Sequence, residues 1–482
     1  MARQEKDLLG YRDIPDNAYW GVQTLRAVEN FPITGLTIQT HPNLIKGLAA
    51  VKLACARTNQ ELGILPSGVA EPIIAACQRI MAGELHDQFI VDVIQGGAGT
   101  STNMNANEVI ANLALEIIGE TRGNYAVINP NDHVNLSQST NDIYPTALKI
   151  ALLYSIVDLR AAMAHLQAAF AAKSREFYHV LKMGRTQLQD AVPMTLGQEF
   201  GAFAIMIGED RDRITEVSAL LTEINLGATA IGTGINAPEG YAALAAEHLS
   251  EITGFSVSTA ADLVEATQDV GSLVQTSGTL KRVAVKLSKI CNDLRLLSSG
   301  PRAGFGEINL PAMQAGSSIM PGKVNPVIPE VVSQVAYEVI GNDVAISMAA
   351  EAGQLQLNAF EPVIFHKLDA GINHLTAACY TLADRCVSGI TANEARLKDM
   401  VEHSIGLATA LNPILGYSVA TGIAAEALVS GRGVAEIVNE RGLMTPEQLA
   451  EVLSPTRLAN LRPLPGDPTA TGSGAETPPH SM

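Results

Sequence analysis

The sequence predicts a mostly α-helical protein built around a bundle of long helices. Hydrophobic residues make up 47% of the 482-residue chain and charged residues only 17%, so enough apolar surface is available for a large packed core. Within four long segments the apolar residues recur with helical period. Gly- and Pro-rich loops, at residues 225–241 and 314–330, lie between these segments.

The four periodic segments lie in the middle of the chain. In residues 273–297 apolar residues recur in steps of three, four and seven, which places them on one face of a helix. Residues 144–177 show the same pattern, and residues 330–348 and 361–385 form two further segments. Helices of this length, apolar over much of their surface, are best buried in a bundle.

Changes in composition predict three domains and a tail. Residues 1–135 combine short helices with Gly- and Asn-rich turns, residues 136–390 hold the long helices, and residues 391–462 return to shorter helical segments. One short helix is expected to start at Thr445, where Pro, Glu and Gln follow as at a capped N-terminus. Residues 463–482 are rich in Pro, Gly, Ser and Thr, which predicts a disordered tail.

Composition also limits the partners and the compartment. Asp and Glu number 49 against 32 Lys and Arg, so the net charge of −17 argues against nucleic acid or an anionic membrane as a partner. A small anion would need a locally positive site. The five cysteines are few and mostly within apolar helical runs, which indicates reduced thiols and a cytoplasmic protein. No targeting segment and no membrane-spanning run of about 18 apolar residues is apparent.

Nucleotide and metal sites are not predicted. Residues 316–323 imitate a phosphate-binding loop, but five residues separate the glycines where four are required, and Val324 follows Lys323 where Ser or Thr is needed. The ten histidines are scattered and the sequence contains no C-x-x-C pair, so no metal ligand set is recognised.

Four clusters of hydroxyl and amide side chains flank the apolar segments. A single cluster of this kind usually caps a helix or forms a turn, because Ser, Thr and Asn favour these positions. If the four converge, they form a pocket of neutral donors with one cation, which suits a small dicarboxylate. The clusters are residues 100–103 with Asn105, residues 137–142, residues 185–187, and residues 317–318 with Lys323 and Asn325.

The chain resembles the aspartase/fumarase superfamily, whose signature is similar to the segment GSSIMPGKVNP at residues 316–326. The resemblance extends over nearly the whole chain before the tail and includes NPNDHVNLSQSTNDIYPT and KMGRTQLQDAVPMT. In NLGATAIGTG, GKVNPVIPEVV and AEAGQLQLN the sequence is more similar to the aspartate ammonia-lyases of this superfamily than to its class II fumarases.

The resemblance implies a three-domain, mostly helical subunit whose long helices join those of three other copies in the twenty-helix core of a homotetramer. Each active site would be built from three subunits, so the four clusters would meet only in the tetramer. The implied reaction is the reversible removal of ammonia from L-aspartate to give fumarate, which makes the protein a carbon–nitrogen lyase. No cofactor is implied as a requirement, although some relatives are activated by a divalent cation.

The resemblance also implies a role for each site residue. Ser317 would be the general base, which needs activation because a serine hydroxyl is a weak base at neutral pH. Lys323 and N–H groups of the Gly-rich loop would stabilise its alkoxide. The substrate-binding residues would be Thr100, Ser139, Thr140 and Ser318 for the β-carboxylate, Lys323 and Asn325 for the α-carboxylate, Asn141, Thr186 and Gln187 for the amino group, and Arg26 as a supporting cation.

Two other functions stay open at this level. Fumarate hydratase would use the same base and carboxylate site, but Gln187 favours ammonia as the leaving group because an amide cannot act as a general acid or base. A helical scaffold without catalytic activity is the second alternative. It is disfavoured by the intact set Thr100, Thr186, Ser317, Lys323 and Asn325.

Overall fold

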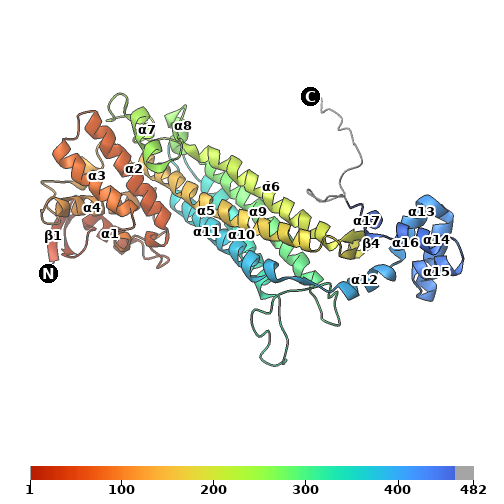
Figure 1. Cartoon of the computed structure of the whole chain (residues 1–482). Coiled ribbons are helices and arrows are strands. Elements are labelled where there is room, and N and C mark those ends of the chain that lie inside the picture. The colour runs from red at the N-terminus through yellow and green to blue at the C-terminus, as the bar shows by residue number, and fades with distance from the viewer. Residues whose placement is uncertain (1, 462–482) are drawn as a thin grey trace. The chain divides into compact units, whose positions relative to one another are not determined.

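A computed structural model describes residues 2–461, and it is mostly α-helical, as the sequence predicts (Figure 1). The four predicted long helices are confirmed, and a fifth, α6, was not predicted. The long helices are α5 (Thr140–Glu176), α6 (Leu196–Ser218), α9 (Gly271–Leu297), α10 (Val327–Glu351) and α11 (Glu361–Arg385). The predicted tail, residues 463–482, lies outside the described residues.

The chain divides into two compact units, each assembled from three stretches of sequence. The first unit comprises Met1–Leu166, Met206–Cys291 and Pro329–Leu382. The second unit comprises Gln167–Ile205, Asn292–Ile328 and the described part of Ala383–Met482. The division into three domains that composition predicts stays a prediction.

Burial and polar contacts hold the long helices together within the first unit. Ser277 Oγ on α9 donates to Asp343 Oδ1 on α10 at 2.8 Å, and Ser155 Oγ on α5 donates to Asp369 Oδ1 on α11 at 2.7 Å. The predicted apolar face of α9 is buried, with Leu280, Val283, Leu287 and Ile290 at most 2% exposed. Apolar periodicity therefore gave the correct buried face.

Shorter elements complete the first unit. The strands β1 (Ala2–Asp7) and β2 (Gly10–Pro15) form an antiparallel hairpin, and β5 (Glu223–Ile224) pairs in parallel with β6 (Ser258–Thr259). A π-helical turn covers Pro130–Val134. The helices are α1 (Val22–Asn30), α2 (Pro42–Glu61), α3 (Ser67–Met81), α4 (Thr100–Ile117), α7 (Tyr241–Thr253) and α8 (Leu263–Gln268), with 3₁₀ turns at Ile38–Thr40, His86–Gln88 and Ala219–Thr222.

The second unit contains two small antiparallel sheets and the C-terminal helices. The strand β3 (Leu181–Thr186) pairs with β4 (Gln189–Thr195), and β7 (Ile308–Asn309) pairs with β8 (Thr391–Ala392). The helices are α12 (Glu394–Glu402), α13 (Ala408–Leu415), α14 (Tyr417–Ser430), α15 (Val434–Glu440), α16 (Pro446–Val452) and α17 (Pro455–Leu458), with 3₁₀ turns at Val387–Gly389 and Ile405–Leu407.

Two local predictions are confirmed. Thr445 caps α16 through a reciprocal pair of hydrogen bonds, in which Gln448 N donates to Thr445 Oγ1 and Thr445 N donates to Gln448 Oε1. All five cysteines are buried, and none of them is part of a disulfide bond. Among the helices of residues 2–461, none has the length and apolar character needed to cross a lipid bilayer.

Candidate active site

Two helix N-termini of the first unit carry predicted site residues. The helix α4 starts at Thr100, directly after a turn in which Gly97, Ala98 and Gly99 all have positive φ angles of 91°, 55° and 86°. A Cβ atom on Gly99 would lie 2.3 Å from the ring of Tyr144, so only glycine fits there. The Thr100 side chain is exposed at this helix start, where backbone N–H groups favour an anion.

The start of α5 is fixed by the buried carboxylate of Asp142. Its Oδ1 accepts from Ser139 N at 3.0 Å, and its Oδ2 accepts from Gly227 N and Thr229 N at 3.1 and 2.9 Å. Burial raises the pKa of Asp142 to about 6 despite these hydrogen bonds. Asn141 Nδ2 donates to Ala230 O at 2.7 Å. The predicted loop at 225–241 therefore holds Ser139 and Asn141 in place.

A hydrogen bond joins the first and second predicted clusters. Asn103 Nδ2, one turn into α4, donates to Thr140 Oγ1 at 3.0 Å and to Asn135 Oδ1 at 3.1 Å. Asn103 of the first cluster and Thr140 of the second thus share one hydrogen-bond network, whereas Thr100 Oγ1 donates to Gly97 O at 2.8 Å. We call residues 97–103 and 135–142 the helix-start segments.

The tip of the β3–β4 hairpin carries the third predicted cluster in the second unit. Thr186 pairs with Gln189, which leaves Gln187 and Leu188 as a two-residue turn with φ angles of 55° and 63°. Such a turn requires positive φ at both central residues and usually contains Asn and Gly. Two bulkier residues here cost about 1 kcal/mol each or more, strain of the kind found at functional sites. Thr186 and Gln187 are exposed.

Arg185, which the sequence placed in the same cluster, has a different position. It forms an ion pair with Glu307, whose side chain is fully buried and lies 2.9 Å from Lys182 Nζ. The Arg185 guanidinium also lies 4.2 Å from the ring centroid of Phe305. Arg185, Lys182 and Glu307 therefore anchor the hairpin whose tip is exposed. Sequence reasoning missed Lys182 and Glu307, because their partners are far away in the chain.

The Gly-rich loop, residues 314–326, contains the fourth cluster and closes on itself. Gly316 N donates to Lys323 O at 2.8 Å, and Asn325 Nδ2 donates to Gly316 O at 2.7 Å. Ser317 Oγ accepts from Met320 N at 2.9 Å and from Ile319 N at 3.2 Å. Two N–H groups directed at one hydroxyl oxygen stabilise negative charge on that oxygen.

The predicted residues therefore fall into two sets. The first unit holds Arg26, Thr100, Ser139, Thr140 and Asn141, and the second unit holds Thr186, Gln187, Ser317, Ser318, Lys323 and Asn325. The convergence of the two sets on one substrate stays a prediction.

Arg26 is already paired within the first unit. Its Nε and Nη2 donate to the two carboxylate oxygens of Asp7 at 2.6 and 2.7 Å, and Nη2 also donates to Gly10 O. The Arg26 side chain lowers the pKa of Asp7 in turn. Arg26 thus connects α1 to the β1–β2 hairpin, and its predicted contact with substrate stays untested.

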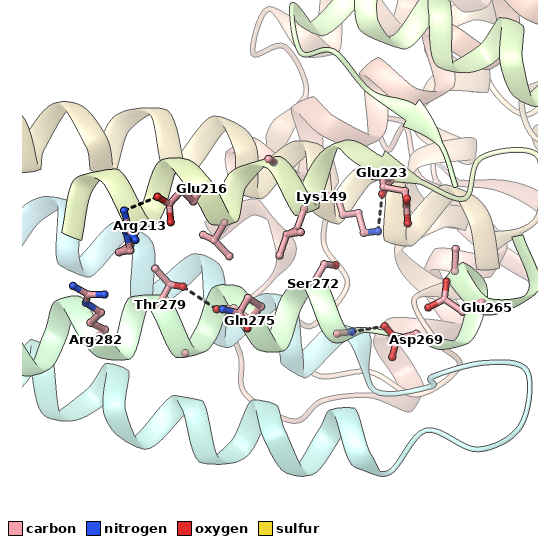
Figure 2. A pocket seen from close by; sticks show the side chains of 16 residues that line it. Lys149, Arg213, Glu216, Glu223, Glu265, Asp269, Ser272, Gln275, Thr279 and Arg282 are labelled. Carbon is pink, nitrogen blue, oxygen red and sulfur yellow. Dashed lines mark hydrogen bonds and ion pairs between the residues drawn. The ribbon is translucent and has the colours of Figure 1, made fainter. Parts of the chain in front are cut away.

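The first unit also contains a cavity of about 760 Å³ beside α6 and α9, shown in Figure 2, and no predicted site residue lines it. Both signs of charge lie along its wall, where Lys149 Nζ donates to Glu223 O at 2.7 Å and Arg213 pairs with Glu216. Residues 2–461 contain no group of three or more His, Cys, Asp or Glu side chains arranged to hold a metal ion.

Comparison with known proteins defines the class of protein. A family model described as "Lyase" matches residues 10–341, and one described as "Fumarase C C-terminus" matches residues 407–460. The chain therefore belongs to the lyase family that includes aspartate ammonia-lyases and class II fumarases.

Individual relatives match along nearly their whole length. The aspartate ammonia-lyase of Pseudomonas fluorescens is 60% identical over 464 residues, which is 96% of this chain and 97% of that protein. A fumarate lyase:delta crystallin of Brucella melitensis, solved with cobalt bound, is 57% identical with a TM-score of 0.93, covering 95% of this chain and 100% of that one. A class II fumarase of Schistosoma mansoni is 34% identical with a TM-score of 0.90, covering 95% of this chain and 99% of that one.

Proposed function

We propose that the protein is a carbon–nitrogen lyase that converts L-aspartate reversibly into fumarate and ammonia. The observation that carries this proposal is the 60% identity, over 96% of the chain, to an aspartate ammonia-lyase. The identity to a class II fumarase is 34%. Gln187 supports the same choice, because loss of ammonia from an ammonium group needs no added proton, whereas loss of water from a hydroxy acid does.

The proposed reaction proceeds in two steps. Ser317, as the alkoxide, removes a proton from the carbon next to the β-carboxylate, and the electron pair of the broken C–H bond moves into that carboxylate. The resulting aci-carboxylate carries an additional negative charge. When the pair returns to form the C=C bond, the C–N bond breaks and ammonia leaves, with the abstracted proton on Ser317.

Stabilising the aci-carboxylate is the main task of the site. Preorganised donors aimed at the oxygens that gain charge are the most effective means. The hydroxyls of Thr100, Ser139 and Thr140 lie at helix N-termini, where the helix dipole adds to their effect. Ser318 would be the fourth donor to this carboxylate.

The other substrate groups are assigned mainly to residues of the second set, together with Asn141 and Arg26 of the first set. Lys323 and Asn325 would bind the α-carboxylate, and Thr186, Gln187 and Asn141 would border the amino group, with Arg26 as a more distant cation. The N–H groups of Ile319 and Met320 that point at Ser317 Oγ support its role as the base. Closure of the Gly-rich loop over substrate would complete the site and exclude water.

The protein would work as a homotetramer, with each site taking the helix-start segments, the hairpin tip and the Gly-rich loop from three different copies. Exposed apolar side chains along α10 support burial against other copies, because patches of this kind mark interaction surfaces. Tyr337, Val344 and Met348 are 56%, 60% and 68% exposed in the single chain.

We further propose that the enzyme acts in the cytoplasm without an obligatory cofactor and that a divalent cation would at most activate it. Chelation followed by addition of Mg²⁺ tests this separately. Activity that disappears with chelator and returns only with metal would contradict the absence of a requirement.

The absorbance of fumarate tests the reaction itself. The purified protein is expected to form fumarate from L-aspartate with release of an equal amount of ammonia, and to form little from L-malate. Fumarate from L-malate but not from L-aspartate would identify a fumarate hydratase instead. A folded protein inactive on both would support a scaffold without catalytic activity.

A further inference from the structure

Lys52 on α2 is a buried cation that the proposed mechanism does not use. Its side chain is 0% exposed, and its ammonium donates to two neutral amide oxygens, Asn135 Oδ1 at 2.9 Å and Gln138 Oε1 at 2.8 Å. A buried charge is expensive unless it is paired, and the carboxylate that attracts this one, Asp142, is not among its hydrogen-bond partners. A lysine retained under these conditions needs a reason beyond packing.

The two acceptors of Lys52 belong to the turn that leads into α5. Within this turn Asn135 Nδ2 donates to Gln138 O, and Gln138 Nε2 donates to Val134 O and Leu136 O. Ser137 has a φ angle of 65°, which is unfavourable for a residue with a side chain. Lys52 thus holds both ends of a strained turn, and Ser139 and Thr140 follow this turn directly.

A short relay connects Lys52 to Thr140. Asn135 Oδ1 accepts from Lys52, from Asn103 Nδ2 at 3.1 Å and from Asn107 Nδ2 at 3.1 Å, so three donors meet at one oxygen. The same Asn103 amide donates to Thr140 Oγ1 at 3.0 Å. Because Thr140 Oγ1 accepts there, the Thr140 hydroxyl proton is left to donate elsewhere.

We propose that Lys52 is a positioning residue of the proposed aspartate-deaminating site: its buried charge, acting through Asn135 and Asn103, holds Thr140 as a donor to the β-carboxylate and offsets the charge gained in the aci-carboxylate. Electrostatic effects of this kind are strong where water is excluded. The inference rests on the proposed function, since it assigns Lys52 to the same carboxylate.

The charged and titratable groups around Lys52 are consistent with this role. Burial lowers the pKa of Lys52 to about 8. The groups that face it are Asp142 on α5, with a pKa raised to about 6, and the thiols of Cys55 on α2 and Cys77 on α3, each with a pKa raised to about 12. Burial raises the pKa of Tyr241 on α7, which lies beside Cys55, well above the usual 10. Near pH 7 only Lys52 and Asp142 are therefore charged, and Lys52 loses its charge as the pH rises through about 8.

Lys52→Met provides the direct test, because it keeps the length of the side chain and removes the charge. We expect kcat for L-aspartate to fall about 100-fold, with KM changing less than about threefold, because charge stabilisation acts in the transition state. We also expect wild-type kcat to decline above pH 8 as Lys52 loses its charge, and we expect this decline to be absent in Lys52→Met. Lys46→Met, on the same helix but packed over the Tyr154 ring at 4.1 Å, is the matched control and should keep the wild-type kcat and pH profile.

A second variant decides the matter if Lys52→Met does not fold. Asn103→Leu removes the bonds from Asn103 to Thr140 and Asn135, while Lys52 keeps both of its acceptors. The variant should fold, because Asn103 Oδ1 is buried with no hydrogen-bond partner within residues 2–461. We expect a comparable loss of kcat. An unchanged kcat in a folded Lys52→Met or Asn103→Leu protein would overturn the inference, whereas a wild type inactive on L-aspartate would overturn the proposed function instead.

Discussion

The helix-start segments of the first unit and the Gly-rich loop of the second carry the two halves of the proposed chemistry, and they are built differently. Buried polar groups, among them Asp142 and Lys52, hold the helix-start segments in place through hydrogen bonds. The loop is held mainly by bonds within itself, and its Ile319 side chain is 83% exposed. Donors that stabilise charge must be preorganised, whereas a base carried by a loop is free to arrive with the substrate.

The largest expected effect on kcat comes from a substitution in the Gly-rich loop. Ser317→Ala should lower kcat by about 10³-fold or more, because no other group would accept the proton from carbon. The fumarate assay measures kcat, and circular dichroism should show an unchanged fold, since Ser317 Oγ only accepts two bonds within an exposed loop. Ser388→Ala, a serine bonded to Asp384 O in a different exposed turn, is the control and should be fully active. A Ser317→Ala protein with near-normal turnover would remove Ser317 as the base.

Loss of a donor in the helix-start segments should lower kcat somewhat less than Ser317→Ala does. Thr140→Val keeps the shape of the side chain and removes one donor, so we expect kcat to fall about 100-fold, as for loss of one oxyanion donor. The variant also removes one of the two acceptors of Asn103 Nδ2 and leaves the other, Asn135 Oδ1, in place. Thr146→Val is a suitable control, because Thr146 also lies in α5 and is more buried than Thr140, and its only side-chain hydrogen bond within residues 2–461 is to Asn225 at 3.5 Å. Equal kcat values for both variants would contradict the role given to Thr140.

Disruption of the Lys182, Arg185 and Glu307 cluster, which anchors the β3–β4 hairpin, should affect stability more than catalysis. Glu307→Gln leaves Arg185 and Lys182 without a buried carboxylate, which should cost about 3 kcal/mol of stability. We expect a lower melting temperature by calorimetry and about a tenfold lower kcat, since Thr186 and Gln187 follow Arg185 directly. Glu402→Gln, whose only ion pair within the described residues is an exposed contact with Lys398 at 3.7 Å, should match the wild type. A Glu307→Gln protein with unchanged melting would show that the anchor is unimportant.

A pH dependence of stability is expected from buried carboxyl groups of the first unit and not from the exposed Gly-rich loop. Burial raises the pKa of Glu361 to about 8, while Lys149 lowers it by a smaller amount. In the unfolded chain the carboxyl ionises near 4.5, so its contribution to stability is lost as the pH rises from 4.5 to about 8. Glu361→Gln should therefore melt like the wild type near pH 4.5 and above it at pH 9. A difference in melting temperature that does not change with pH would contradict the raised pKa.

The smallest expected effect is a local difference in hydrogen exchange between the Gly-rich loop and the helix-start segments. Backbone amides of the Gly-rich loop are expected to exchange faster than those of residues 135–142, because the loop has few buried contacts. Addition of fumarate should slow exchange in the loop and leave the helix-start segments unchanged. Equal protection of both regions without ligand would remove the distinction between a fixed and a mobile half.

The sequence predicted the fold well where periodicity was strong and missed α6, where it was interrupted. Gly197 and Gly201 lie in the first two turns of α6, and glycine normally weakens a helix. In the structure a Cβ atom on Gly197 would lie 2.5 Å from Ser174 O, so this glycine permits close packing against the end of α5. Only tertiary contact explains the glycine, and the sequence around α6 does not reveal that contact.

The site shows the same limit. Ser139 and Thr140 could be predicted because hydroxyl and amide residues cluster around them. Lys52 could not, because its two acceptors follow 83 and 86 residues later and it stands alone among apolar neighbours. Glu307 likewise lies 122 residues from Arg185. Local composition therefore identified the proposed substrate donors but not the buried groups that hold them.

Co-expression of two inactive chains tests the central claim most directly. A Thr140→Val chain and a Ser317→Ala chain, carrying different affinity tags, should assemble into mixed tetramers that are purified by both tags in turn. If each site takes Thr140 and Ser317 from different copies, random mixing leaves about a quarter of the sites intact, and activity should recover to that extent. Mixed tetramers no more active than the separate variants would contradict a site shared between subunits.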